Sequence, residues 1–245
     1  MTHSRVVRPQ IFSHIPQLVA GISTRHGGVS SQAFQSLNLG VHTDDDPSAI
    51  TQNLSLFCSD LGIAPESLAR SYQVHGSEIW TSVAPGYESG YDAIVSTTPG
   101  IFAGVGIADC CPILLADPVR QTAAAIHAGW KGTVAQIVHK TASTLIAGGS
   151  NPSDILAYIG PCISLAHFEV GDEVAEQFEL KEQRGARWHV DLKATNAAQL
   201  HALGITQIEI SDYCTVANND LFYSHRKEQG VTGRMLAVIG FQRRG

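Results

Sequence analysis

Two short apolar runs separated by a turn signal constrain the fold of this chain more than any other feature. The runs cover residues 113–116 and 123–126, and Asp117-Pro118-Val119-Arg120 lies between them. Proline at the second position of a turn fixes φ in the range that a tight turn needs, so the segment predicts a β-hairpin. Both faces of this hairpin are apolar, and we therefore expect other elements to cover both of them.

The register of this hairpin brings a cysteine and a histidine together. If Pro118 and Val119 form a two-residue turn, Asp117 pairs with Arg120, and counting back along both strands places Cys110 directly opposite His127. Directly opposed residues have Cβ atoms about 4.5–5.5 Å apart, close enough for a sulfur and an imidazole nitrogen to share a metal ion. A bulge in the turn would shift the register by one residue and leave both side chains at the same end of the hairpin.

A third candidate ligand, His75, lies in Gln73-Val74-His75-Gly76. Two histidines and one cysteine leave one tetrahedral position open, which is the ligand count of a catalytic zinc site. We therefore take His75, Cys110 and His127 as candidate metal ligands and catalytic residues. Taken singly, each has an ordinary explanation, since a histidine can end a strand and a lone cysteine is often a small buried hydrophobe.

A glycine-rich turn follows His127. Gly129 and Gly132 bracket Trp130-Lys131 where a strand is expected to lead into a helix. Glycines permit close backbone approach, and the start of a helix offers free N–H groups to an anion. Lys131 would add positive charge, so the turn is a candidate phosphate site; the alternative is an ordinary helix start with a solvated lysine.

Composition excludes several classes of protein. At 245 residues the chain can bury one substantial core, and its charge of −6 without a basic run argues against nucleic acid as a partner. No apolar run reaches the length of a signal peptide or a membrane span, so we expect no membrane partner. The five cysteines are scattered, which fits free thiols in a reducing cytoplasm better than a disulfide framework.

The pattern of elements predicts an α+β fold in one domain, residues 1–245. Short turns join most strands and helices are inserted between groups of strands, so we expect mixed or antiparallel sheets sandwiched between helices, layered α/β/β/α. Expected strands cover 18–25, 70–74, 78–83, 92–96, 101–107, 155–159, 207–211 and 234–241, besides the hairpin. Expected helices begin at Pro47 and cover 134–145, 171–179 and 194–203.

Motifs along nearly the whole chain resemble the laccase-domain family, also described as zinc-dependent purine nucleoside phosphorylases. They comprise 23–30, 37–40, 73–76, Asp109-Cys110, 127–132, 159–163, 222–226 and 232–234. Two positions depart from the family pattern. Lys131 stands where arginine is common, and Cys111 stands where an aliphatic residue is frequent; alternation along the strand turns Cys111 toward packing on the opposite face.

The resemblance implies that His75, Cys110 and His127 bind zinc, which copper could replace. It implies phosphorolysis of adenosine, inosine, guanosine and methylthioadenosine, with adenosine deamination as a second activity, so purine nucleosides and phosphate are the expected partners. Arg25, Asn38 and Arg226 fall in family motifs and, with Lys131, are candidate contacts for phosphate or ribose. Asp109 is a further candidate, as a partner of the ligand cysteine or a proton carrier, although alternation turns it away from Cys110.

Three other readings stay open. A copper-dependent polyphenol oxidase of the four-copper type is disfavoured, because such enzymes need many histidines in His-x-His pairs and none of the 11 histidines here lie two residues apart. A cysteine hydrolase that edits cell-wall peptide precursors would use Cys110 as nucleophile and His127 as base without metal. A metal-stabilised binding protein would unfold without its ion. The oligomeric state is left open.

Overall fold

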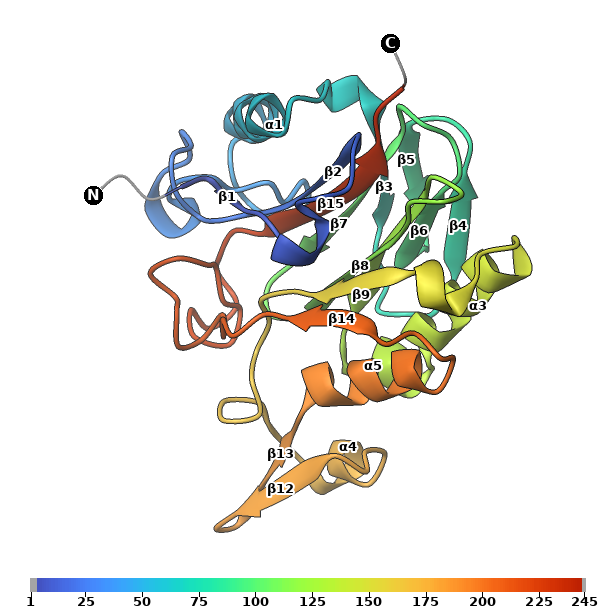
Figure 1. Ribbon diagram of the computed structural model, residues 1–245. Coiled ribbons are helices and arrows are strands. Elements are labelled where there is room, and N and C mark those ends of the chain that lie inside the picture. Colours follow the sequence, from blue (N-terminus) through green and yellow to red (C-terminus); the bar gives the residue numbers. More distant parts are fainter. Residues whose placement is uncertain (1–3, 244–245) are drawn as a thin grey trace.

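Two six-stranded β-sheets face each other in this protein, and helices cover their outer surfaces (Figure 1). The computed structural model describes residues 4–243. Its layers confirm the predicted α/β/β/α arrangement of mixed sheets. The first three residues, which bear on the expectation that no signal peptide is present, lie outside the described part.

The first sheet contains the first and the last strand of the chain, β1 and β15. Its strands pair antiparallel from β1 to β7, and β3 pairs parallel with both β7 and β5. In spatial order they are β1 (Val6–Val7), β2 (Leu18–Ser23), β15 (Met235–Phe241), β7 (Phe102–Ile107), β3 (Leu68–Tyr72) and β5 (Gly86–Ser89).

The second sheet has the predicted hairpin at its centre. Its two edge strands, β14 and β4, pair parallel with their neighbours, and the inner pairs are antiparallel. In spatial order the strands are β14 (Gln207–Ile210), β10 (Leu156–Ile159), β8 (Cys111–Asp117), β9 (Thr122–Ala128), β6 (Ala93–Ser96) and β4 (Ile79–Ser82).

Side-chain alternation along β8 shows why the hairpin is apolar on both faces. Leu114 and Ala116 pack into the core between the two sheets, whereas Ile113 and Leu115 pack toward the helices outside the second sheet. The helices there are α3 (Ile137–Ala147) and α5 (Leu192–His201). The expectation that both faces are covered is confirmed.

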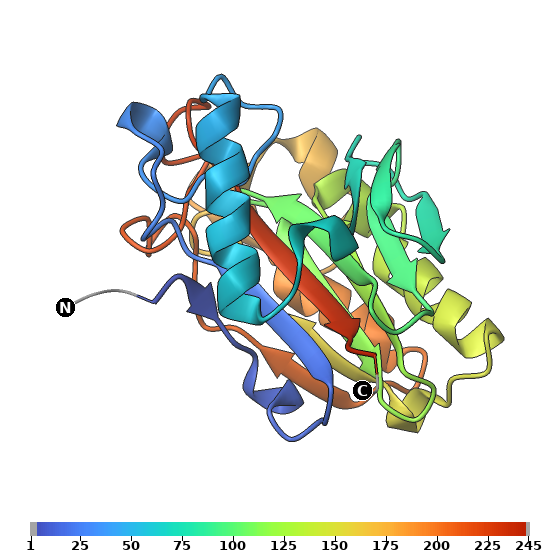
Figure 2. The ribbon, with the colours of Figure 1, turned by 90° about the horizontal axis from the view of Figure 1, so that it is seen from above.

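The outer face of the first sheet is covered by α1 (Pro47–Leu61), which Figure 2 shows lying across β15. The helix begins where Asp46 caps the Ser48 N–H and Pro47 takes the first position, and it ends at Gly62 with φ of 71°. Phe57 and Leu61 pack on Val238, forming a third, smaller core.

The hairpin turn differs from the prediction. Asp117 pairs with Thr122 rather than Arg120, so the loop has four residues and His127 lies opposite Pro112 rather than Cys110. The Asp117 carboxylate accepts the N–H groups of Val119 and Arg120, which is turn chemistry that extends the loop beyond Pro118-Val119. The register is therefore shifted by two residues, and because side chains alternate with a period of two, Cys110 and His127 stay on the same side.

The remaining elements depart from the expectations in length. The predicted helix at 134–145 is two helices, α2 (Trp130–Val134) and α3, separated where Gln136 has φ of 60°. The helix expected at 171–179 is the single turn α4 (Asp172–Ala175). A small sheet of β11 (Glu169–Val170), β13 (Arg187–Val190) and β12 (Lys181–Arg184) was not predicted, and its hairpin projects from the body in Figure 1. Short 3-10 helices lie at Gln10–Phe12, Gln32–Phe34, Pro65–Ser67 and Pro152–Asp154. Within residues 4–243, no helix combines the length and apolar character needed to span a bilayer.

Candidate active site and metal centre

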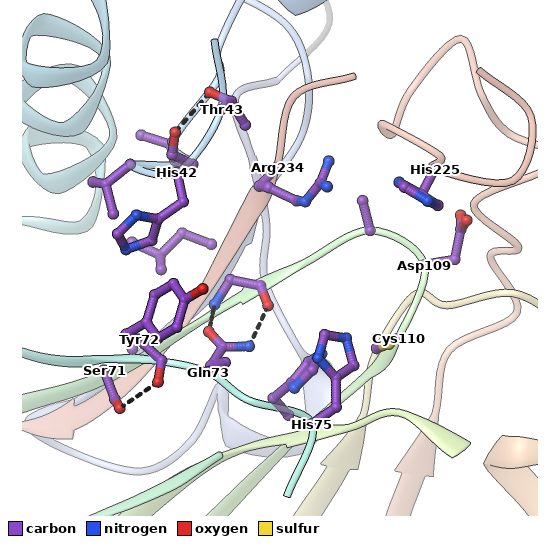
Figure 3. A pocket seen from close by; sticks show the side chains of 18 of the residues that line it. His42, Thr43, Ser71, Tyr72, Gln73, His75, Asp109, Cys110, His225 and Arg234 are labelled. Atoms are coloured by element: carbon purple, nitrogen blue, oxygen red, sulfur yellow. Dashed lines mark hydrogen bonds between the residues drawn. The ribbon is translucent and has the colours of Figure 1, made fainter. Parts of the chain in front are cut away.

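A pocket of about 560 Å³ opens where the ends of both sheets meet, and Figure 3 shows part of its lining. Its floor on the first sheet is β7, whose alternate residues Gly104 and Gly106 face the pocket while Val105 faces the core between the sheets. A Cβ at Gly104 would lie only 3.3 Å from Cγ of Arg70. These glycines therefore leave space that side chains would otherwise fill.

The three candidate ligands meet at one end of this pocket. The ligand atoms of His75, Cys110 and His127 all lie within 4.8 Å of one another, and the two imidazole rings are 4.9 Å apart at 81°. Cys110 immediately precedes β8, His127 lies near the end of β9, and His75 lies in the loop after β3. All three line the pocket; His75 is exposed, Cys110 is half-buried and His127 is buried.

A fully buried carboxylate, Asp92, organises two of the three ligands. Its Oδ1 accepts from Nδ1 of His127 at 2.8 Å and from the N–H of His75 at 3.0 Å, and its Oδ2 accepts the N–H groups of Val74 and Gly76. His75 has φ of 59°, a left-handed conformation that these bonds support. Because Nδ1 of His127 is hydrogen-bonded to Asp92, Nε2 is the nitrogen that could bind a metal ion. The same arrangement occurs in metal sites where a carboxylate orients the ligand histidine.

Gly129 permits the sulfur and the imidazole to approach the chain. A Cβ at this position would lie 2.9 Å from Sγ of Cys110 and 3.3 Å from Cδ2 of His75. Only glycine fits between them. The close backbone approach expected for this glycine is therefore toward the ligand residues. The helix that follows, α2, has five residues, which is short for an anion-binding helix end.

The electrostatics of the cluster favour a thiolate. Burial raises the pKa of the Cys110 thiol, but the charge and hydrogen bond of His127, with a hydrogen bond from His75, outweigh burial and lower the pKa to about 6. Burial lowers the pKa of His127, whereas Cys110 and Asp92 raise it to about 9. The thiolate is the form of cysteine that binds a metal ion or acts as a nucleophile.

The donor set fits a metal ion. Two imidazoles and one thiolate at mutual distances below 4.8 Å can converge on one tetrahedral ion, and Asp92 supplies the orienting hydrogen bond behind one of them. Within residues 4–243 this is the one group of three or more His, Cys, Asp or Glu side chains arranged in this way. An ion held by these three side chains would keep one tetrahedral position for a substrate or water.

Asp109, next to the ligand cysteine, holds two loops together. Its carboxylate accepts the hydroxyl of Thr215 at 2.5 Å and the N–H of Arg226 at 2.8 Å, and its carbonyl accepts the N–H of Ile163. Asp109 also lines the pocket. These bonds fix the wall of the pocket beside Cys110.

Arg25 and Asn38, two of the four candidate substrate residues, lie outside the pocket lining, as does Lys131. Arg25 bonds Gln35 and Asn219 through their carbonyls and pairs with Glu228 at 3.0 Å. Asn38 is fully buried and uses both ends of its amide: Nδ2 donates to Thr43 and Asp45, and Oδ1 accepts the N–H groups of Gly40 and Arg234. Both residues organise loops around the pocket.

The other two lie near the cluster. Arg226 lines the pocket, but its terminal nitrogens donate to the carbonyls of His167 and Glu169. Lys131 is exposed and places its ammonium 5.6 Å from the ring of Trp130, whose side chain lines the pocket whereas Lys131 does not.

Sequence reasoning missed two residues of this site. Asp92 stands alone before a short strand, and no motif spacing links it to His127. Arg234 lies in the motif 232–234 without an assigned role, yet its side chain lines the pocket. A buried acid at a strand start and an arginine beside a glycine are both common, so neither pattern gives a signal without the fold.

Comparison with known proteins identifies the family. The family described as multi-copper polyphenol oxidoreductase laccase matches residues 19–242. This chain belongs to that family. A Deinococcus radiodurans protein named purine nucleoside phosphorylase is 41% identical to this laccase-family chain over 228 residues, covering 91% of this chain and 88% of the relative.

Other relatives agree over almost the full length. The Escherichia coli protein named purine nucleoside phosphorylase YfiH is 35% identical, covering 96% of the laccase-family chain and 98% of the relative. The crystal structure of YlmD from Geobacillus stearothermophilus superimposes with a TM-score of 0.93 at 30% identity, covering 99% and 98% of the two chains. The fold and the family are therefore both established.

Proposed function

We propose that this chain is a zinc-dependent purine nucleoside phosphorylase that acts on adenosine, inosine, guanosine and S-methyl-5′-thioadenosine, with adenosine deamination as a second activity. The observation that carries the proposal is the His75–Cys110–His127 cluster at one end of a large pocket, in a chain whose relatives are named purine nucleoside phosphorylases. A volume of about 560 Å³ lies in the range of small-molecule sites.

The part of the pocket away from the His75–Cys110–His127 cluster suits an aromatic base. His42, Tyr72 and Tyr87 line it; Nε2 of His42 lies 2.7 Å from the hydroxyl of Tyr87, and the rings of His42 and Tyr72 are 4.6 Å apart. Aromatic faces stack on purines, and hydroxyl and imidazole groups can hydrogen-bond their edges. We therefore place the base among these side chains and the ribose toward the cluster.

The residues of the cluster hold and orient the reacting groups. Asp92 fixes the ring of His127, the Asp92-bound loop 74–76 presents His75, and Gly129 lets Cys110 reach both. Zinc, when bound by these side chains, would supply a Lewis acid to an oxygen of phosphate or water. Copper is a possible substitute because it binds nitrogen and sulfur ligands tightly. The one such ligand cluster found in residues 4–243 does not support four-copper chemistry. The five free cysteines favour a cytoplasmic location.

The direct test is turnover by zinc-loaded protein. Adenosine with phosphate should yield adenine and ribose 1-phosphate, and adenosine without phosphate should yield inosine and ammonia. Cys110→Ala should abolish both reactions, whereas Cys58→Ala, a matched change on the buried face of α1, should retain them. Absence of product, or equal rates in the Cys110→Ala variant, would refute the proposal.

One observation also favours a second candidate, a metal-free cysteine hydrolase acting on cell-wall peptide precursors. Cys110, His127 and Asp92 form a nucleophile–base–acid series in which the acid orients the base. His75 separates the two candidates. A metal site requires His75 as a ligand, whereas hydrolysis by Cys110, His127 and Asp92 does not use the His75 side chain. His75→Ala should therefore remove stoichiometric metal and turnover if the first proposal holds, and leave hydrolysis intact if the second does.

A further inference from the structure

Arg234 is a cation on the pocket wall for which the proposed reaction has as yet no role. It directly precedes β15, and Figure 3 shows its guanidinium directed into the pocket, between His42 and Tyr72 on one side and Cys110 and His225 on the other. It therefore lies between the part of the pocket assigned to the base and the His75–Cys110–His127 cluster.

The side chain of Arg234 is held in place before any ligand binds. Oδ1 of Asn38 accepts its backbone N–H at 2.9 Å, and its own Nη1 donates to the carbonyls of Thr232 and Gly233, both at 2.9 Å. Gly40 makes room for its aliphatic stem, since a Cβ on Gly40 would lie 2.7 Å from Cγ of Arg234. These contacts occupy one nitrogen and leave Nη2 and Nε for a ligand.

The charge of Arg234 is incompletely compensated. Within residues 4–243, no carboxylate lies within ion-pair distance of its guanidinium, although it is near enough to Asp109, Cys110 and Glu228 to interact with their charges. The nearest acid of the pocket wall, Asp109, is already bonded to Thr215 and to the backbone of Arg226. Burial lowers the pKa of Arg234. A half-buried guanidinium with free donors is suited to an anion.

The other two arginines of the pocket are placed differently. Both terminal nitrogens of Arg226 donate to backbone carbonyls, those of His167 and Glu169. Arg70 lies over the ring of Tyr87 at 5.8 Å, beside the aromatic side chains. Arg234 is therefore the arginine that combines free donors with proximity to the cluster.

We propose that Arg234 binds the phosphate co-substrate beside the His75–Cys110–His127 cluster. This inference rests on the proposed phosphorolysis. In that reaction an oxygen of hydrogen phosphate forms a bond to C1′ of the ribose while the glycosidic bond breaks and its electron pair leaves with the base nitrogen. The proton that the phosphate gives up balances the proton that the departing base takes up. Arg234 holds the oxygens that do not attack, so that the attacking oxygen faces C1′.

The experiment compares Arg234→Gln and Arg234→Lys with Arg187→Gln, a change of the same charge on the exposed strand β13. Steady-state kinetics of the zinc-loaded proteins with inosine should show the phosphate KM raised about tenfold or more in Arg234→Gln, the effect of losing hydrogen bonds to a charged group. The inosine KM should change less than about twofold, Arg234→Lys should recover part of the loss, and Arg187→Gln should match the wild type. Circular dichroism checks that each variant is folded.

A binding measurement separates this inference from the proposed function. Inorganic phosphate is titrated calorimetrically into the zinc-loaded protein without nucleoside. Phosphate binding that is lost in Arg234→Gln, in a protein that cleaves no nucleoside, supports the anion site and refutes the phosphorylase. Phosphorolysis with an unchanged phosphate KM in Arg234→Gln overturns the anion site alone. Phosphate affinity that is equal in wild type and Arg234→Gln also overturns it.

Discussion

The geometry of the candidate ligand cluster depends on two residues that lie outside the cluster itself. Gly129 provides space and Asp92 provides direction: one permits Cys110 and His75 to meet at the chain, and the other fixes the imidazole of His127 and the loop that carries His75. We therefore expect a substitution at either residue to weaken metal binding although all three ligand side chains remain.

Gly129→Ala should weaken metal binding while the fold persists. The added methyl would lie 2.9 Å from Sγ of Cys110, closer than side chains tolerate, so the sulfur or the loop must move. We expect substoichiometric zinc by elemental analysis and a circular dichroism spectrum like that of the wild type. Gly86→Ala is the matched control, because its Cβ would meet only Trp80 at 3.8 Å. Full zinc content in Gly129→Ala would contradict this account of the glycine.

Asp92→Asn should lower metal affinity by about 10- to 100-fold, the usual effect of removing a carboxylate behind a ligand histidine. The amide keeps the shape of the side chain but removes its charge and one acceptor from His127 and the 74–76 loop. Competition with a chromophoric chelator measures the change. Asp117→Asn is the control, since Asp117 is equally buried but lies at the turn of the hairpin. If both variants lose metal equally, the effect of Asp92 is general destabilisation.

At the scale of elements, most strands of the two large sheets and the long helix α1 were predictable because alternation and capping are local; β1 and β5 were not predicted. The register of the hairpin was not predictable, because the Asp117 side chain stabilises a four-residue loop. Cys110 and His127 still lie on the same side because the register shifted by two residues, which is the side-chain period of a strand. The small sheet β11–β13–β12 escaped prediction because its strands are short and largely exposed. Asp92 and Arg234 reach the site through tertiary contacts that no local spacing encodes.

Glu228, in the segment 224–232, is expected to make a pH-dependent contribution to the stability of the fold. Glu228 accepts the N–H of Ser224, the hydroxyl of Thr232 and the guanidinium of Arg25. Burial raises the pKa of Glu228, but these hydrogen bonds and the charge of Arg25 outweigh burial and lower the pKa below its usual value. A carboxyl with a lowered folded pKa stabilises the protein above its unfolded pKa, about 4.3. That stability is lost as the pH falls through the folded value.

Glu228→Gln should therefore reduce the free energy of unfolding at pH 7 by about 2 kcal/mol, the scale of hydrogen bonds to a charged group. The difference from the wild type should shrink as the pH falls below 4.3, since the protonated acid and the amide then resemble each other. Urea denaturation of the metal-free proteins at pH 7 and at successively lower pH measures both. A difference that stays constant with pH would show that the charge of Glu228 does not contribute.

At the scale of the whole molecule, we expect folding and metal binding to be separable. Three apolar cores hold the layers together, one between the sheets and one under the helices on each side, and the ligand cluster lies at the edge of these cores rather than within any of them. The ligands come from three segments that hydrogen bonds already fix, through Asp92 and the pairing of β8 with β9. We therefore expect the pocket to assemble without an ion.

Removal of metal by a chelator should abolish turnover and leave the protein folded. Binding at a thousandfold excess over Kd contributes about 4 kcal/mol, and at 2–4 °C per kcal/mol for a chain of this size the Tm should fall by roughly 10 °C. Circular dichroism at 25 °C should not change, and added zinc should restore activity. A metal-stabilised binding protein behaves differently: chelation would unfold it cooperatively at 25 °C, because its ion supplies the energy of folding. Thermal melts of the loaded and stripped protein distinguish the two, since only a site built by the surrounding cores keeps a sharp transition without its ion.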